Sequence, residues 1–136
     1  MERFAVEFKL SNNIDVALAR RGLLPSGQVR QVTIQGMVGT GTMRLVIPAC
    51  VAEQLGLPET GETQVHYADG RRATRKLVGN IRVELLGRES TFRAIVEPNR
   101  DSAIIGAIVL EELDLVVDCT AQTLRPRDPK YITSEI

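Results

Sequence analysis

Short runs in which apolar and polar residues alternate recur along most of this chain and limit the folds open to it. Residues 4–10, 29–38 and 81–85 each have this period of two. A period of two places successive side chains on opposite faces of a β-strand. Turn signals such as Pro25-Ser26-Gly27 and Asp69-Gly70 separate the runs. The pattern predicts about eight short strands in a closed or sandwich-like β domain.

Two short helices are expected among these strands. Residues 48–56 begin with proline and end with glycine, which favours a helix over 49–55 that stops at the glycine. Residues 108–113 predict a second helix with its glutamates facing outward. Residues 14–21 fit either a short strand or a helical turn, and the sequence leaves both open.

The length and charge of the chain restrict its class. We expect one domain over residues 1–136, with its core over about 4–128 and a loosely held tail at 129–136. Lys and Arg number 17, as do Asp and Glu, so the net charge of zero argues against a protein that mainly binds nucleic acid. The basic run 71–76 contains no interleaved aromatic residues, and we interpret it as a solvated hairpin arm rather than a nucleic-acid contact.

The cysteines and the histidine offer little material for a reactive or metal site. Cys50 and Cys119 lie in no CxxC pair, and we expect both to be buried thiols of a cytoplasmic protein. His66 is expected on the solvent face of a strand. A zinc site needs three or four ligands, so no metal or cofactor is predicted. No run approaches the roughly 18 apolar residues of a membrane span, so no membrane partner is expected.

The most informative segment is residues 37–48, in which Gly39-Thr40-Gly41-Thr42 lies between apolar residues and a further apolar run that ends in Pro48. The segment does not match a P-loop, because no Lys follows in the required position. It resembles the active-site turn of retropepsin-like (clan AA) aspartic peptidases. In that turn two apolar residues lead into Asp-Thr/Ser-Gly, and an apolar run follows.

Four further segments resemble the small bacterial members of this family, in the same order along the chain. Residues 51–57 resemble their helix and Gly-Leu stop, and 67–70 the tip of their flap. Residues 104–106 resemble the apolar-apolar-Gly element, and 113–126 the closing strands. The resemblance covers roughly residues 4–128. It implies an all-β, retropepsin-like acid protease fold with one lobe per chain, an active site shared by a homodimer, and a peptide or protein as substrate.

The chain departs from the family at Gly39, where the family has its catalytic aspartate. In the family, two carboxylates share one proton, and together they activate water and protonate the scissile carbonyl. Glycine removes both carboxylates from a dimer at once, so we predict little or no hydrolysis. Asp69, Asp101 and Asp118 are not expected to substitute, because the resemblance places them on the flap, a loop and a strand end.

The resemblance also assigns roles to the other residues of the site. The Thr40 hydroxyl would bond across the two-fold axis, and Gly41 would let its amide approach the site closely. Substrate-binding positions would be Thr42, Tyr67, Ala68, Asp69, Gly70, Ile105 and Gly106. Two interpretations stay open, an inactivated aspartic endopeptidase and a natural non-catalytic module for peptide binding or dimerisation. We favour the first, because every other piece of the pattern is intact.

Overall fold

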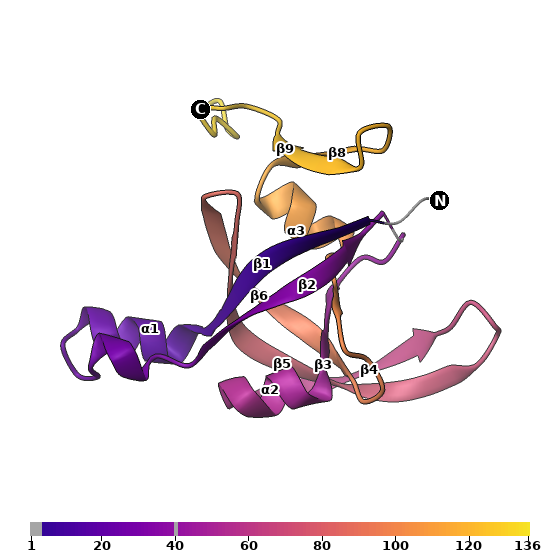
Figure 1. Ribbon diagram of the computed structural model, residues 1–136. Helices are drawn as coiled ribbons and strands as arrows, with labels where there is room; N and C mark the ends of the chain where they lie inside the picture. The colour runs from indigo at the N-terminus through magenta and orange to yellow at the C-terminus, as the bar shows by residue number, and fades with distance from the viewer. Residues whose placement is uncertain (1–3, 40) are drawn as a thin grey trace.

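Figure 1 shows the computed structural model of the chain, which describes residues 4–39 and 41–136. The strands in this part of the chain are β1 (Phe4–Asn12), β2 (Gln31–Val38), β3 (Leu45–Pro48), β4 (Glu59–His66), β5 (Arg72–Leu85), β6 (Arg88–Glu97), β7 (Ala103–Ile104), β8 (Leu115–Asp118) and β9 (Thr123–Pro126). The helices are α1 (Asn13–Arg20), α2 (Ala49–Leu55), α3 (Ala107–Glu112) and the short 3-10 helix η1 (Ser26–Gln28).

Six of the strands form a closed ring. They are hydrogen-bonded in the order β1-β2-β7-β3-β6-β5, and β5 pairs back to β1 through residues such as Val83, which lies opposite Leu10. Among the described strands, β4 pairs with β5 alone, so it extends the sheet beyond the ring as one arm of a hairpin. The strands β8 and β9 form a separate two-stranded sheet. The predicted closed, mainly-β domain is therefore confirmed.

Alternation along the strands places the core inside the ring. Phe8 and Leu10 of β1 are buried, as are Ile81, Val83 and Leu85 of β5. Each such side chain contributes about 1.5–3 kcal/mol when it leaves water. Helix α2 packs against β2, β3 and β6 and adds Val51 and Leu55 to the core, and its predicted bounds and glycine stop are confirmed.

The strand β5 is longer than the sequence indicated. The sequence predicts the basic hairpin arm at residues 71–76 and the alternating run at 81–85 as separate segments, but the structure joins them in one strand of 14 residues. Its pairing with β6 shifts register between Val78 and Ile81, where Asn80 has a φ of 57°. This irregularity bends the strand, as β-bulges do. One end of β5 can therefore belong to the ring while the other extends into the hairpin with β4.

Both cysteines were predicted to be buried, and this prediction was wrong. Cys50 and Cys119 are exposed free thiols. Cys50 is the second residue of α2, whose inward face is occupied by Val51 and Leu55. Cys119 directly follows β8, at the turn into β9. Apolar neighbours in the sequence do not say which face of a short helix or which side of a turn a residue occupies.

The open choice at residues 14–21 is settled in favour of helix, because side chains cap α1 where β1 ends. The Asn12 side chain accepts a hydrogen bond from the Asp15 amide at 3.1 Å and donates to the Leu55 carbonyl at 2.8 Å. Asp15 in turn accepts hydrogen bonds from the Arg30 backbone amide and from its Nε and Nη2 atoms, at 2.8–3.0 Å. These bonds attach α1 to the barrel.

We expect the Asp15–Arg30 contact to make stability depend on pH. Hydrogen bonds from the Arg30 side chain lower the pKa of Asp15 in the folded protein. The stabilisation is therefore complete above the unfolded pKa of about 3.9 and is lost as the pH falls through the lower folded pKa. Asp15→Asn should lower the free energy of unfolding at neutral pH by about 1–3 kcal/mol. Urea unfolding at several pH values measures the difference from wild type.

The difference between wild type and Asp15→Asn should shrink steadily below about pH 4. Asp101→Asn, at an exposed loop position, is the matched control and should follow wild type throughout. A destabilisation by Asp15→Asn that is the same size at pH 7 and at pH 2 would show that the charge of Asp15 does not contribute.

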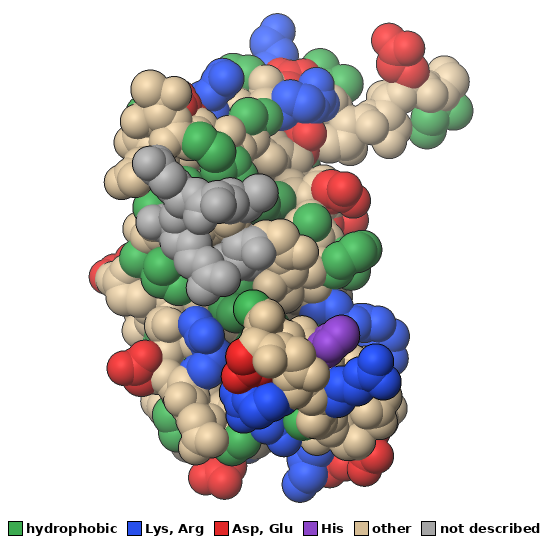
Figure 2. All heavy atoms as spheres, turned by 90° about the vertical axis from the view of Figure 1, so that its right-hand side faces the viewer, with side chains coloured by type: hydrophobic (Ala, Val, Ile, Leu, Met, Phe, Trp, Pro, Cys, Tyr) green, Lys and Arg blue, Asp and Glu red, His purple; other side chains and the backbone are tan. Residues whose placement is uncertain are grey.

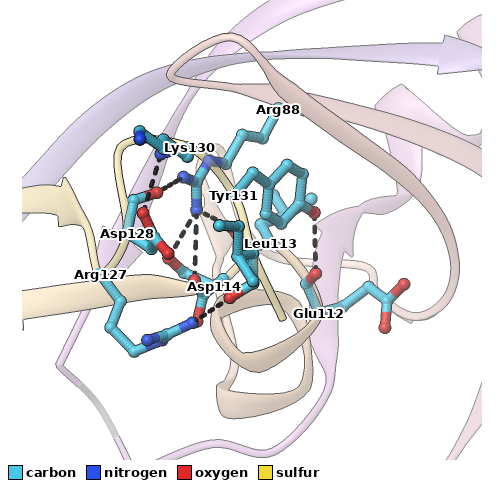
Figure 3. A network of polar contacts seen from close by, with 9 residues as sticks. Arg88, Glu112, Leu113, Asp114, Arg127, Asp128, Lys130 and Tyr131 are labelled. Carbon is cyan, nitrogen blue, oxygen red and sulfur yellow. Dashed lines mark hydrogen bonds and ion pairs between the residues drawn. The ribbon is translucent and has the colours of Figure 1, made fainter. Parts of the chain in front are cut away.

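The C-terminal sheet is attached to the barrel through Arg88, the first residue of β6 (Figure 3). Only 6% of Arg88 is exposed, and its guanidinium donates to the backbone carbonyls of Leu113, Asp114 and Asp128. It also lies over the ring of Tyr131, 4.0 Å from the centroid. The Tyr131 hydroxyl donates to the Glu112 carbonyl at 3.0 Å. The start of the predicted tail thus has defined contacts, and the mobility of its last residues stays a prediction.

Candidate functional site

The hairpin of β4 and β5 extends from the barrel on the right of Figure 1, and a tight turn closes its end. The Gly70 amide donates to the Tyr67 carbonyl at 2.9 Å, and Gly70 has a φ of 90° that favours glycine. The Asp69 carboxylate accepts hydrogen bonds from the backbone amide and Nε of Arg71, which lower the pKa of Asp69. Asp69 and Gly70 therefore shape the turn itself.

The segment opposite the hairpin is the loop between β2 and β3. Gly39 follows β2 with a φ of 83°, and Gly41 has a φ of 80°. L-residues with a side chain rarely adopt such angles. Beyond the glycines, the carbonyls of Thr42 and Met43 accept hydrogen bonds from the first two residues of α3, both at 2.9 Å. Helix α3 thus holds this loop in place. Thr40 lies outside the described residues, and its predicted role is not tested.

A cleft of about 750 Å³ lies between the loop and the hairpin. Four of the predicted site residues line it, namely Gly41, Thr42, Tyr67 and Ala68. The loop also contributes Met43 and Arg44, and the hairpin contributes residues 63–66. The remaining walls are Val46, Ile95, Glu97, Arg100 and Ile104. The structure therefore brings the two most distinctive segments of the sequence to one concave site.

Two predicted substrate-binding residues lie behind this loop. Ile105 is 2% exposed and belongs to the core cluster. Gly106 packs against the loop backbone, since a Cβ on it would lie 2.2 Å from the Arg44 carbonyl oxygen and 2.4 Å from that of Met43. These contacts give both residues a role in supporting the cleft. Direct contact with a ligand stays a prediction for them.

A polar cluster that the sequence did not reveal joins the hairpin to the end of β6. The Tyr67 hydroxyl donates to Glu97 Oε1 at 2.6 Å, and Arg75 Nε lies 3.1 Å from the same oxygen and 3.0 Å from the hydroxyl. Burial, and then the bond to Glu97, raise the pKa of Tyr67, so the phenol keeps its proton and continues to donate. Glu97 was missed because the residues that it contacts are 22 and 30 positions away in the sequence.

The charged groups of the cleft determine what chemistry one chain can perform. Glu97 is the sole acidic residue among the described residues that line it. Its carboxylate is occupied by Arg75 and Tyr67. His66 also lines the cleft, and it is exposed, as the sequence predicted. Residues 4–39 and 41–136 contain no group of three side chains suited to a metal ion, and they form no helix long and apolar enough to cross a membrane.

A closed six-stranded barrel, with a hairpin facing a glycine-flanked loop across a cleft, defines a retropepsin-like fold. Comparison with solved structures confirms it. The EIAV protease complexed with the inhibitor HBY-793 is similar to this chain, with a TM-score of 0.57 over 82% of this chain and 88% of that protein. The two share 15% sequence identity, so the likeness concerns the fold. No protein-family model and no curated protein matches the sequence.

Proposed function

We propose that this chain binds an extended peptide in the cleft between residues 41–44 and the β4–β5 hairpin, and that it does not hydrolyse the peptide. The observation that carries the proposal is the cleft of about 750 Å³ that these two segments form. The hairpin offers a suitable edge, since β4 ends the seven-stranded sheet and pairs with β5 alone among the described strands. An extended peptide can add its backbone to such an edge.

The absence of hydrolysis follows from the carboxylates of the site. Hydrolysis of the aspartic type needs two carboxylates that share a proton. Gly39 supplies none, and Glu97 is already bound to Arg75 and Tyr67. We propose that the chain forms the two-fold homodimer implied by the family resemblance, with the two loops at residues 39–42 facing each other. Such a dimer would bring together two glycines in place of two aspartates.

The backbone at Gly39 supports the second interpretation of the sequence, a non-catalytic module for peptide binding or dimerisation. Its φ of 83° disfavours an aspartate. A residue with a side chain destabilises the folded state by about 1–2 kcal/mol when its backbone lies in the left-handed region. The loop conformation therefore suits the residue that is present, whereas an inactivated enzyme would be expected to keep a loop that accepts aspartate without strain. Cytoplasmic location stays a prediction.

Peptide binding can be tested by NMR titration of the isotope-labelled protein with a mixture of N-acetylated, C-amidated decapeptides. We expect amide shifts concentrated at residues 41–44 and 63–68, and mass spectrometry should find the peptides intact after incubation. Shifts that are absent from both segments would refute binding in this cleft. Cleavage by the unaltered chain would refute the claim that it does not hydrolyse.

Restoring the family's aspartate at residue 39 distinguishes the two interpretations. Gly39→Asp should remain folded and dimeric by analytical ultracentrifugation and leave mixed peptides uncleaved from acid to neutral pH, if the chain is a binding module. Cleavage that a statine-type inhibitor blocks would instead identify an inactivated endopeptidase. Gly41→Asp is the matched control, because it adds the same side chain to the same loop at a residue that also has positive φ.

A further inference from the structure

The cleft carries positive charge that the described part of the chain does not neutralise. The charge comes from Arg44 and Arg100, which both line the cleft and are half-buried. The exposed His66 of β4 lies on the hairpin side of the same cleft. Figure 2 views the molecule from the hairpin side and shows basic side chains gathered around the histidine. A concave surface lined by one sign of charge concentrates the electric field and attracts ions of the opposite sign.

The one acidic residue of the cleft does not cancel this charge. Glu97 is 13% exposed at its side chain and forms an ion pair with Arg75, whose side chain is 26% exposed. The Tyr67 hydroxyl occupies the same carboxylate oxygen. Glu97 and Arg75 therefore neutralise each other, and the charges of Arg44 and Arg100 remain.

Arg100 is held in place by neutral groups. Its Nε donates to the Ser102 carbonyl at 3.0 Å, and its Nη2 donates to the Ser102 hydroxyl at 3.1 Å. These bonds orient the guanidinium, and no described residue pairs with its charge or binds its second terminal nitrogen. A guanidinium that is oriented in advance loses less entropy when it binds a ligand.

Arg44 has no carboxylate within ion-pair distance in the described part of the chain. This distinguishes it from most other arginines of the protein. The arginines that lie within 4.0 Å of an acidic side chain are Arg20, Arg30, Arg71, Arg75, Arg82, Arg88 and Arg127. The two arginines of the cleft are thus left for a ligand.

We propose that the cleft selects peptides that carry a carboxylate, and that Arg44 and Arg100 bind it. The inference rests on the proposed function, since it names the class of peptide for the same cleft. A guanidinium presents parallel N–H donors that match both oxygens of a carboxylate. The carboxylate can be an Asp or Glu side chain or the C-terminus of the peptide.

Affinity measurements with three peptide sets test the proposal. The first set is N-acetylated and C-amidated with one Glu at each position in turn, and the second has Gln instead of Glu. The third is the Gln set with a free C-terminus. We expect a Glu peptide to bind about tenfold more tightly than its Gln counterpart, because hydrogen bonds to charged groups are stronger than those to neutral groups. If affinity rises only in the third set, relative to the amidated Gln set, the proposal is supported with the C-terminus as the carboxylate that binds.

Substitutions assign the preference to its residues. Arg44→Gln and Arg100→Gln should each lower the affinity for acidic peptides severalfold more than the affinity for the neutral set, so that the preference falls. Arg125→Gln is the matched control, because Arg125 is an exposed residue of β9 outside the cleft. Thermal unfolding of each variant verifies that it is folded. Raising the salt concentration should also reduce the preference, because salt screens exposed charges.

The failures of the two proposals are distinguishable. Equal affinity for the acidic, neutral and free C-terminal sets would overturn the inference and leave peptide binding intact. A preference that survives both cleft substitutions would overturn the assignment to these arginines. Absence of binding by every set would overturn the proposed function, and the inference with it.

Discussion

Replacing Arg88 by methionine is expected to lower the free energy of unfolding by about 3–5 kcal/mol, a large effect for one residue. The guanidinium is 6% exposed and donates to the carbonyls of Leu113, Asp114 and Asp128. Methionine keeps much of the aliphatic length but donates no hydrogen bond. The carbonyls of Asp114 and Asp128 would keep the backbone amides of Arg127 and Tyr131 as donors, so the cost falls mainly on the buried bond to the Leu113 carbonyl. A buried polar group without a partner costs about 1–3 kcal/mol.

The loss should be concentrated in the C-terminal sheet. Asp114 Oδ2 lies 3.7 Å from Arg88 and accepts no hydrogen bond from the described residues, so Arg88 compensates the charge of this carboxylate together with Arg127, which binds Oδ1. Urea unfolding measures the stability, and hydrogen exchange should show faster opening of β8 and β9 than of the barrel. Arg125→Met, at an exposed position of β9, is the control and should change stability by less than about 0.5 kcal/mol. An Arg88→Met variant within 1 kcal/mol of wild type would contradict the role given to this network.

The elements that could be predicted from the sequence are those whose signal is local. The alternation in β1 places Phe8 and Leu10 in the core, and the proline and glycine that flank α2 mark its ends. The glycine-flanked loop and the Asp69-Gly70 turn are local in the same sense. Each of these features is determined by residues within a few positions of one another.

The contacts that close the fold could not be predicted from the sequence, because they join residues that are far apart along the chain. The closure of the ring pairs Lys9 with Glu84, and nothing near either residue identifies the other. Arg88 reaches carbonyls 25 to 40 positions away. Because backbone carbonyls occur at every residue, the amino-acid sequence does not indicate which of them Arg88 will bind.

The residues of the candidate site also fall into two groups, those that could be predicted from local sequence and those that could not. The loop with Gly41 and Thr42 and the hairpin with Tyr67 could be predicted, and the structure places both at one cleft. The charged residues of the cleft could not, because Glu97 ends an ordinary strand and Arg100 lies in a polar loop. The proposed preference for acidic peptides therefore depends on tertiary packing, whereas the proposed loss of hydrolysis can be stated from Gly39 in the sequence alone.

Gly106→Ala is the second substitution with a large expected effect. An ideal Cβ would lie 2.2 Å from the Arg44 carbonyl oxygen and 2.4 Å from that of Met43, which is closer than real Cβ atoms approach. Gly106 has a φ of −80°, so the backbone itself accepts alanine and the cost is steric. Both carbonyls belong to backbone that α3 holds by hydrogen bonds, so neither can move freely. We expect a loss of about 3 kcal/mol in the free energy of unfolding.

The same substitution should affect the cleft, since the displaced carbonyls belong to Met43 and Arg44, which line it. Peptide affinity of Gly106→Ala should fall under conditions in which the variant remains folded by circular dichroism. Gly27→Ala is the matched control, because a Cβ there meets nothing within 4 Å, and its stability should stay the same or rise by about 0.4–1 kcal/mol. If Gly106→Ala unfolds like wild type and binds peptide normally, the loop does not depend on close packing against α3. The conformation of the loop would then be set by its own glycines, Gly39 and Gly41, and the sequence resemblance at residues 104–106 would carry no information about the site.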